Sequence, residues 1–149
     1  MIMDERLEFA DATALDTSGT NVDLIGDVID LGSTASDIGN GQPLYCVIQT
    51  SAAVTSGGSA TVVFSLASDA AAAIAVDGTA TTHFSTAAIA VASLTANTQV
   101  AMFALPVDNY ERFLGILTTT GTAALTAGSI DAFLTHDPHG WTALPDAVN

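Results

Sequence analysis

The sequence contains no lysine, and its only strongly basic residues are Arg6 and Arg112. Sixteen acidic residues outnumber these two arginines, so the formal net charge is −14 at pH 7. Proteins bind nucleic acid or anionic membranes through clustered basic side chains, which this chain cannot supply. We therefore expect neither partner. A basic protein surface suits the charge, although solubility alone would explain it equally well.

Cysteine and long apolar runs are also scarce. Cys46 is the single cysteine, which excludes an intrachain disulfide. Its apolar neighbours predict a buried, unreactive thiol rather than a nucleophile. No apolar run approaches the roughly 20 residues of a membrane-spanning helix, and residues 1–9 lack the pattern of a secretory signal. We expect a soluble protein made in the cytoplasm.

Sequence motifs for catalysis are missing as well. The G-x-S-x-G turn of many serine hydrolases does not occur, and a chain without lysine has no Walker motif. Most acidic residues lie in segments broken by glycine, which suits the paired carboxylates of a glycosidase poorly. We therefore expect no enzymatic activity.

The sequence does contain a clear β pattern, which is strongest between residues 41 and 69. Apolar residues alternate with polar or smaller ones over residues 61–66, as in a strand with one buried face. Residues 44–50 are apolar or β-branched almost throughout, which is typical of a strand covered on both faces. Gly57 and Gly58 favour a turn between them, so the stretch predicts a hairpin.

Further strands are expected along the chain, with short edge strands and loops over residues 11–40 and no long helix. The later strands are predicted over residues 82–94, 99–105, 110–119 and 129–135. About eight antiparallel strands close most simply as a two-sheet jelly roll, and an immunoglobulin-like sandwich is the alternative. We predict one all-β domain over residues 1–149, with an N-terminal arm at 1–21 and a C-terminal tail at 136–149.

Two groups of residues raise the question of a bound metal ion. His136 and His139 are three positions apart with Asp137 between them, which is a possible ligand set, but a polar tail held by a proline turn is the favoured interpretation. Asp23, Asp27 and Asp30 would suit calcium in composition. They lack the tight ligand loop of an EF-hand, so acids that face solvent or a partner are favoured.

Arg112 and Trp141 are the other notable side chains. Arg112 stands near the start of a predicted buried strand, where an ion pair or hydrogen bonds to an acid across the sheet are expected. Trp141 is either a plug for the open end of the sandwich or an anchor on a partner, because tryptophan is enriched at interface hot spots.

Four segments together resemble the cement (decoration) proteins of short-tailed bacteriophages, closest to that of a Bordetella podophage. They are Met1 with DERLEF at residues 4–9, VIDLG at 28–32, DIG-x-G-x-PLY at 37–45, and YERFLG at 110–115. Their order and spacing extend from the first residues to about residue 135. The individual segments are short, and it is the combination that carries the resemblance.

The resemblance implies a jelly-roll protein that clamps the major capsid protein on the outside of an icosahedral head. It also implies no catalysis, no cofactor and self-association, with dimers ahead of trimers. We predict that the capsid contacts include Asp4, Glu5, Arg6, Glu8, Asp23, Asp27, Asp30 and Trp141. A carbohydrate- or receptor-binding jelly roll is the alternative, but aromatic residues make up only 6% of the chain.

Overall fold

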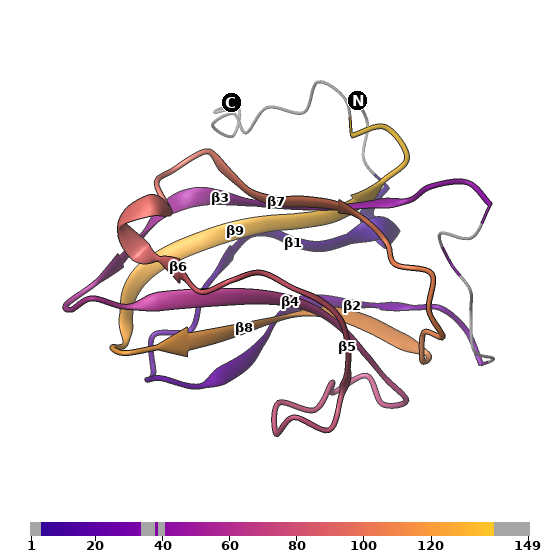
Figure 1. Ribbon diagram of the computed structural model, residues 1–149, viewed down its shortest axis with the longest axis horizontal. Coiled ribbons are helices and arrows are strands. Elements are labelled where there is room, and N and C mark those ends of the chain that lie inside the picture. Colours follow the sequence, from indigo (N-terminus) through magenta and orange to yellow (C-terminus); the bar gives the residue numbers. More distant parts are fainter. Residues whose placement is uncertain (1–3, 34–37, 39–40, 139–149) are drawn as a thin grey trace.

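The computed structural model describes residues 4–33, 38 and 41–138 as two antiparallel sheets packed face to face (Figure 1). The prediction of an all-β, jelly-roll-type sandwich is confirmed, with nine strands where about eight were expected. No helix in the described part of the chain is long and apolar enough to span a bilayer. The elements are η1 Glu5–Leu7, β1 Glu8–Ala14, β2 Val22–Asp30, β3 Tyr45–Ser56, β4 Thr61–Asp69, β5 Thr81–Ser85, β6 Ile89–Ala90, η2 Val91–Ser93, β7 Thr98–Ala104, β8 Phe113–Gly121 and β9 Leu125–Thr135.

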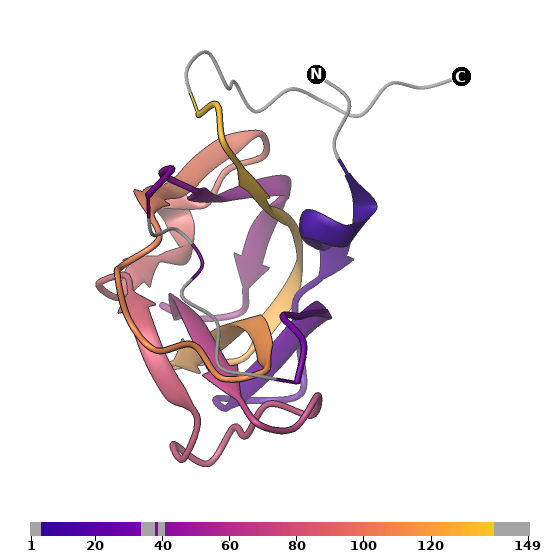
Figure 2. The same ribbon diagram turned by 90° about the vertical axis from the view of Figure 1, so that its right-hand side faces the viewer.

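The strands alternate between the two sheets along most of the chain. One sheet has the order β1-β9-β3-β7, and the other has the order β2-β8-β4-β5 with β6 added to β4. Most strands that follow one another in the chain lie in opposite sheets, and only β4, β5 and β6 share a sheet consecutively. Figure 2 shows the two layers from the end of the sandwich. This alternation between layers is consistent with a jelly roll.

The prediction of a hairpin between residues 41 and 69 is wrong. β3 pairs with β7 and β9, whereas β4 pairs with β5, β6 and β8 in the other sheet. The connection through residues 57–60 therefore crosses from one sheet to the other. Both strands have an apolar face, and the crossing buries these faces against each other, while a flat hairpin would leave them side by side in one layer.

The core follows the predicted alternation. Over residues 61–66, strand β4 buries Val62, Phe64 and Leu66 completely and leaves the residues between them partly exposed. Strand β3 is buried on both faces from Cys46 to Thr50, as expected from its continuous apolar character. Cys46 has no exposed surface, and its burial raises the pKa of the thiol well above the ordinary value. The prediction of a buried cysteine is confirmed.

The prediction of an N-terminal arm over residues 1–21 is wrong for residues 8–14. These residues form β1 at the edge of the first sheet. β1 pairs with β9, and the register shifts between Glu8 and Ala10. The shift places two consecutive residues, Phe9 and Ala10, in the core. A strand with such a bulge loses its period of two, and the sequence pattern therefore did not indicate it.

Strand β2 is a single nine-residue strand rather than the short pieces that were expected. Gly26 lies in its middle with a φ of +70°, and a Cβ atom built there would be 1.9 Å from the carbonyl oxygen of Phe9. The register with β8 shifts between Ile25 and Ile29, so β2 bends at this point. Only glycine permits both the positive φ and the close approach of β1 to β2.

We expect Gly26→Ala to lower the free energy of unfolding by about 3 kcal/mol or more, because the new methyl group overlaps the backbone of β1. Gly32→Ala is the matched control. Gly32 also has a positive φ, of +100°, but nothing lies within 4 Å of its Cβ position, so only backbone strain of about 1 kcal/mol is expected there. Urea unfolding followed by circular dichroism measures both variants, and equal losses would contradict the close approach.

Candidate functional site

Four carboxylates gather at the edge of the sandwich where β1 passes over β2. Glu5 from η1, Glu8 and Asp11 from β1, and Asp27 from β2 line one hollow of about 320 Å³, which we call the acidic hollow. Its other lining residues are uncharged. Three of the predicted contact residues, Glu5, Glu8 and Asp27, are thus brought together by the fold.

Asp11 belongs to the acidic hollow although the sequence did not single it out. In a regular strand, residues three positions apart point to opposite faces, so Glu8 and Asp11 would be separated. The register of β1 with β9 shifts twice between Glu8 and Thr13, and Ala12 adopts a positive φ of 45°. This irregularity lets both carboxylates line the same hollow.

A fifth carboxylate, that of Asp131 on β9, is fixed close to Glu8. Its Oδ1 atom accepts the Ala12 backbone N–H at 2.8 Å, and its Oδ2 atom accepts the Gln49 side-chain amide at 2.9 Å. Burial raises the pKa of Glu8, and the negative charges of Asp11, Asp131 and Glu5 raise it further. The ionised form of Glu8 is therefore disfavoured, and a cationic group in the hollow would relieve this repulsion.

Asp4 and Arg6, two further predicted contact residues, flank the acidic hollow without lining it. Both are exposed, and the Asp4 carboxylate accepts the Arg6 backbone N–H at 3.0 Å, which caps η1. Arg6 directly follows Glu5 in the sequence. The structure therefore places the charged residues 4–6 at the same edge as the hollow.

Asp30 is paired within the chain. Arg112 donates from Nε to Asp30 Oδ1 at 2.9 Å and from its terminal nitrogen to Oδ2 at 2.8 Å. This bidentate contact joins the end of β2 to the start of β8, and it lowers the pKa of Asp30 to about 2. The expectation that Arg112 pairs with an acid across the sheet is confirmed. Asp30 offers a partner only a half-exposed carboxylate that is already engaged.

Asp23 lies in a third environment, away from the other two aspartates of the predicted acidic run. The Asn21 side-chain amide donates to both Asp23 and Asp16 at 3.0 Å. Desolvation, followed by the nearby charge of Asp16, raises the pKa of Asp23. Because Asp23, Asp27 and Asp30 do not converge, the calcium interpretation has no common site. Among the described residues, no group of three or more His, Cys, Asp or Glu side chains is arranged to hold a metal ion.

The C-terminal candidates lie mostly outside the described residues. His139 and Trp141 are beyond them, so neither the two-histidine ligand set nor the place of Trp141 is described. His136 lies within the described part, and its Nδ1 atom is 3.2 Å from the backbone oxygen of Pro43. That contact joins the end of β9 to the segment before β3.

Three polar side chains, Ser68, His83 and Asp108, are linked by hydrogen bonds that the sequence did not indicate. His83 Nε2 lies 2.7 Å from Ser68 Oγ, and His83 Nδ1 lies 2.8 Å from Asp108 Oδ2. Tyr110 packs its ring on the imidazole with centroids 4.1 Å apart, and the Glu111 backbone N–H donates to Ser68 Oγ at 3.1 Å. The three residues come from β4, β5 and the loop before β8, so no local motif could have indicated them.

The order serine, histidine, aspartate matches that of a hydrolytic triad, but its surroundings differ from those of a catalytic site. The Ser68 residue has no exposed surface, and neither does the His83 side chain. Ser68 Oγ already receives a backbone N–H, so its position is fixed by the loop that covers it. In this conformation a substrate cannot reach the hydroxyl. The arrangement instead ties the loop at residues 105–112 to β4 and β5.

Comparison with known proteins places the two-sheet body in a family. The family model described as Bbp16 matches residues 9–134 of the chain. The match begins in β1 and ends in β9, so it includes every strand of both sheets. No curated protein matches the chain.

Glu8→Gln should raise the free energy of unfolding at pH 7 by about 0.5 kcal/mol, the scale of a single partly exposed charge interaction. The folded-state pKa of Glu8 is raised. The stability that its protonated carboxyl contributes is therefore fully present at low pH and is lost as the pH rises through that pKa. Glutamine resembles the protonated form at every pH. The gain should therefore vanish at pH 3 in urea unfolding experiments.

Asp30→Asn provides the control of opposite sign. The pKa of Asp30 is lowered to about 2, so its contribution is present at neutral pH and is lost as the pH falls below 4 toward 2. This variant should be less stable than the parent at pH 7, with a difference that shrinks over that range. A Glu8→Gln protein that is less stable than the parent at pH 7 but equally stable at pH 3 would show that the Glu8 carboxylate makes a favourable contact instead.

Proposed function

The chain belongs to the Bbp16 family, and from this premise we propose that it is a cement (decoration) protein on the outer surface of a tailed-phage head. The family name fits a Bordetella phage protein, which is compatible with a structural virion protein. The observation that carries the proposal is the family match, which extends over all strands of the sandwich. The resemblance of residues 1–135 to podophage cement proteins supports the capsid role.

The proposed partner is the major capsid protein, bound through a basic part of its surface. The acidic hollow supports this choice, because Glu5, Glu8, Asp11 and Asp27 face one concave site with no cation among its lining residues. Lysine or arginine side chains of the shell would neutralise carboxylates that repel one another in the free protein. The proposed contact is non-covalent, in keeping with a chain that has no lysine to donate to an isopeptide bond.

Many weak contacts suffice for this role. A decoration protein that holds several capsid subunits at once gains from the high effective concentration of the second and later contacts. Self-association adds to the same effect, and we propose dimers ahead of trimers. The proposal includes no nucleic acid, membrane or cofactor and no catalysis, in keeping with a net charge of −14 and the buried hydroxyl of Ser68.

Carbohydrate or receptor binding is the second-ranked function. Sugar sites commonly use exposed aromatic rings as stacking surfaces. The hollow at the β3–β4 end of the sandwich, of about 620 Å³, is lined entirely by aliphatic, hydroxyl-bearing and glycine residues. That lining offers a sugar no aromatic ring, so it gives the second function little support.

The proposal predicts that the acidic hollow governs binding to capsids. The double variant Glu8→Gln with Asp27→Asn should rebind depleted phage heads at least tenfold more weakly than the parent in a sedimentation assay. The double variant Asp77→Asn with Glu111→Gln changes the net charge equally, but neither residue lines the hollow. It should bind within about twofold of the parent.

Ionic strength provides the companion measurement. Screening acts over about 8 Å at physiological salt, so raised salt should release the parent protein from heads and should affect the hollow variant less. Binding that is indifferent to salt, together with equal affinities for the two double variants, would remove the acidic hollow from the capsid contact.

A further inference from the structure

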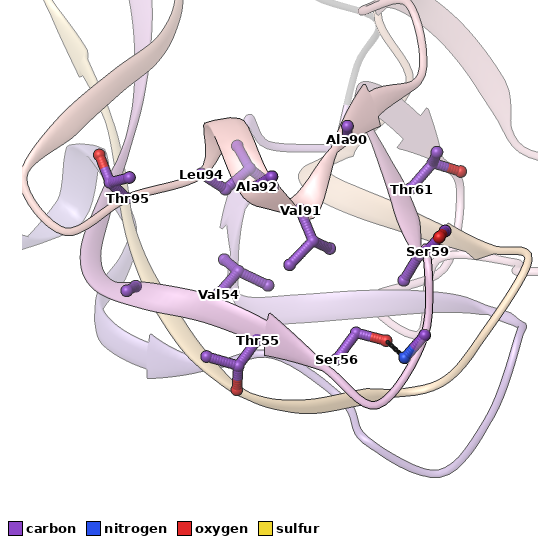
Figure 3. A pocket seen from close by; sticks show the side chains of 13 residues that line it. Val54, Thr55, Ser56, Ser59, Thr61, Ala90, Val91, Ala92, Leu94 and Thr95 are labelled. Atoms are coloured by element: carbon purple, nitrogen blue, oxygen red, sulfur yellow. Dashed lines mark hydrogen bonds between the residues drawn. The ribbon is translucent and has the colours of Figure 1, made fainter.

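A second hollow lies at the end of the sandwich where β3 passes into β4. It has a volume of about 620 Å³ and is bounded by the β3–β4 connection and by η2 (Figure 3). Val54 and Val91 point toward each other into it, and Leu94 and Ala60 add to its apolar wall. The remaining lining is alanine, glycine, serine and threonine, so no ionisable side chain lines it. We call it the end hollow.

The backbone beside the end hollow is also incompletely paired. β9 pairs with β3 as far as Ser56, whereas the register of β7 with β3 ends at Thr50. Beyond Thr50, a single backbone bond on the β7 side is described, from the Val54 N–H to the Leu94 oxygen at 2.9 Å. The last residues of β3 therefore form a sheet edge next to an apolar cavity. Such an edge accepts an extended peptide by strand addition, with side chains in the cavity.

The chemistry of the end hollow selects its occupant. In a chain of net charge −14, an uncharged apolar lining is unsuited to the basic capsid groups proposed for the acidic hollow. It suits an extended segment with one large apolar side chain and no charge. Residues 141–144, with the sequence WTAL, have this composition and contain the only tryptophan of the protein.

The described part of the chain ends too far from its own end hollow for Trp141 to enter it. Thr135 pairs with Tyr45 at the start of β3, while the hollow is lined by Val54 and its neighbours near the other end of the strand. Nine residues of strand separate Tyr45 from Val54, which is about 30 Å. Trp141 follows Thr135 by six residues, a reach of about 22 Å at most.

We infer that the end hollow binds the segment at residues 141–144 of a second copy of this chain. The inference rests on the self-association part of the proposed function and names its contact. The chain leaves the sandwich at one end, and the hollow lies at the other (Figure 1). Two copies side by side in opposite directions would each present this segment to the other's hollow. A two-fold exchange fills both hollows and closes the dimer.

The fluorescence of the only tryptophan tests this contact directly in the full-length protein. As the protein concentration rises through the monomer–dimer transition measured by sedimentation, the emission maximum of Trp141 should move to shorter wavelength. Acrylamide quenching should fall over the same range, because the indole leaves water for an apolar site. Both changes should share one midpoint with the sedimentation data.

Two single substitutions in η2 provide the matched comparison. Ala92 is exposed and lines the end hollow, while the adjacent Ser93 is exposed and does not line it. Ala92→Glu should shift the transition to at least tenfold higher concentration, and Ser93→Glu should leave it within twofold. Circular dichroism establishes that both fold. Trp141→Ala should shift the sedimentation midpoint as Ala92→Glu does.

Three results would overturn the inference. They are a Trp141 signal that does not change with concentration, identical behaviour of Ala92→Glu and Ser93→Glu, and protection of Trp141 that appears only when capsids are added. Dimers that form without protecting Trp141 would also overturn it while leaving self-association intact. Binding of the Ala92→Glu protein to heads is measured separately, so failure of this contact is distinguishable from failure of the capsid role.

Discussion

Mutual burial of two apolar sheet faces is the interaction on which the rest of this structure depends. Ile48 in one sheet and Phe64 in the other have no exposed surface, and each layer would expose an apolar face to water without the other. The chain satisfies this requirement by crossing between layers at most of its connections. Most charged residues lie at the edges, in loops or on the outer faces, while Asp131 is buried against Ala12 and Gln49.

The closing of the sandwich produces two hollows of different chemistry. On one side, the glycine at position 26 lets β1 approach β2, and the carboxylates of Glu8 and Asp27 come to line the same acidic hollow. At one end, β3 extends past β7, and an uncharged hollow opens between Val54 and Val91. The first suits a basic neighbour and the second suits an apolar segment. In the proposed role, the two hollows would bind the shell and a second copy without competition.

The sequence predicted the fold class because alternation such as that of residues 61–66 depends only on which face is buried. It did not predict strand pairing, since the same alternation fits a hairpin and a crossing between sheets. β1 escaped detection because its bulge places Phe9 and Ala10 together in the core. The acidic contact residues were predicted singly, but their convergence requires the approach at Gly26.

The central claim is that this acidic sandwich binds the outside of a phage head through the edge formed by β1 and β2. A cryo-electron microscopy reconstruction of the intact head tests it most directly. The account predicts density for the two-sheet body on the outer surface, with Glu8 and Asp27 within 4 Å of lysine or arginine side chains of the major capsid protein, a distance at which ion pairs form. Heads without this density, or with the acidic hollow facing solvent, would contradict it.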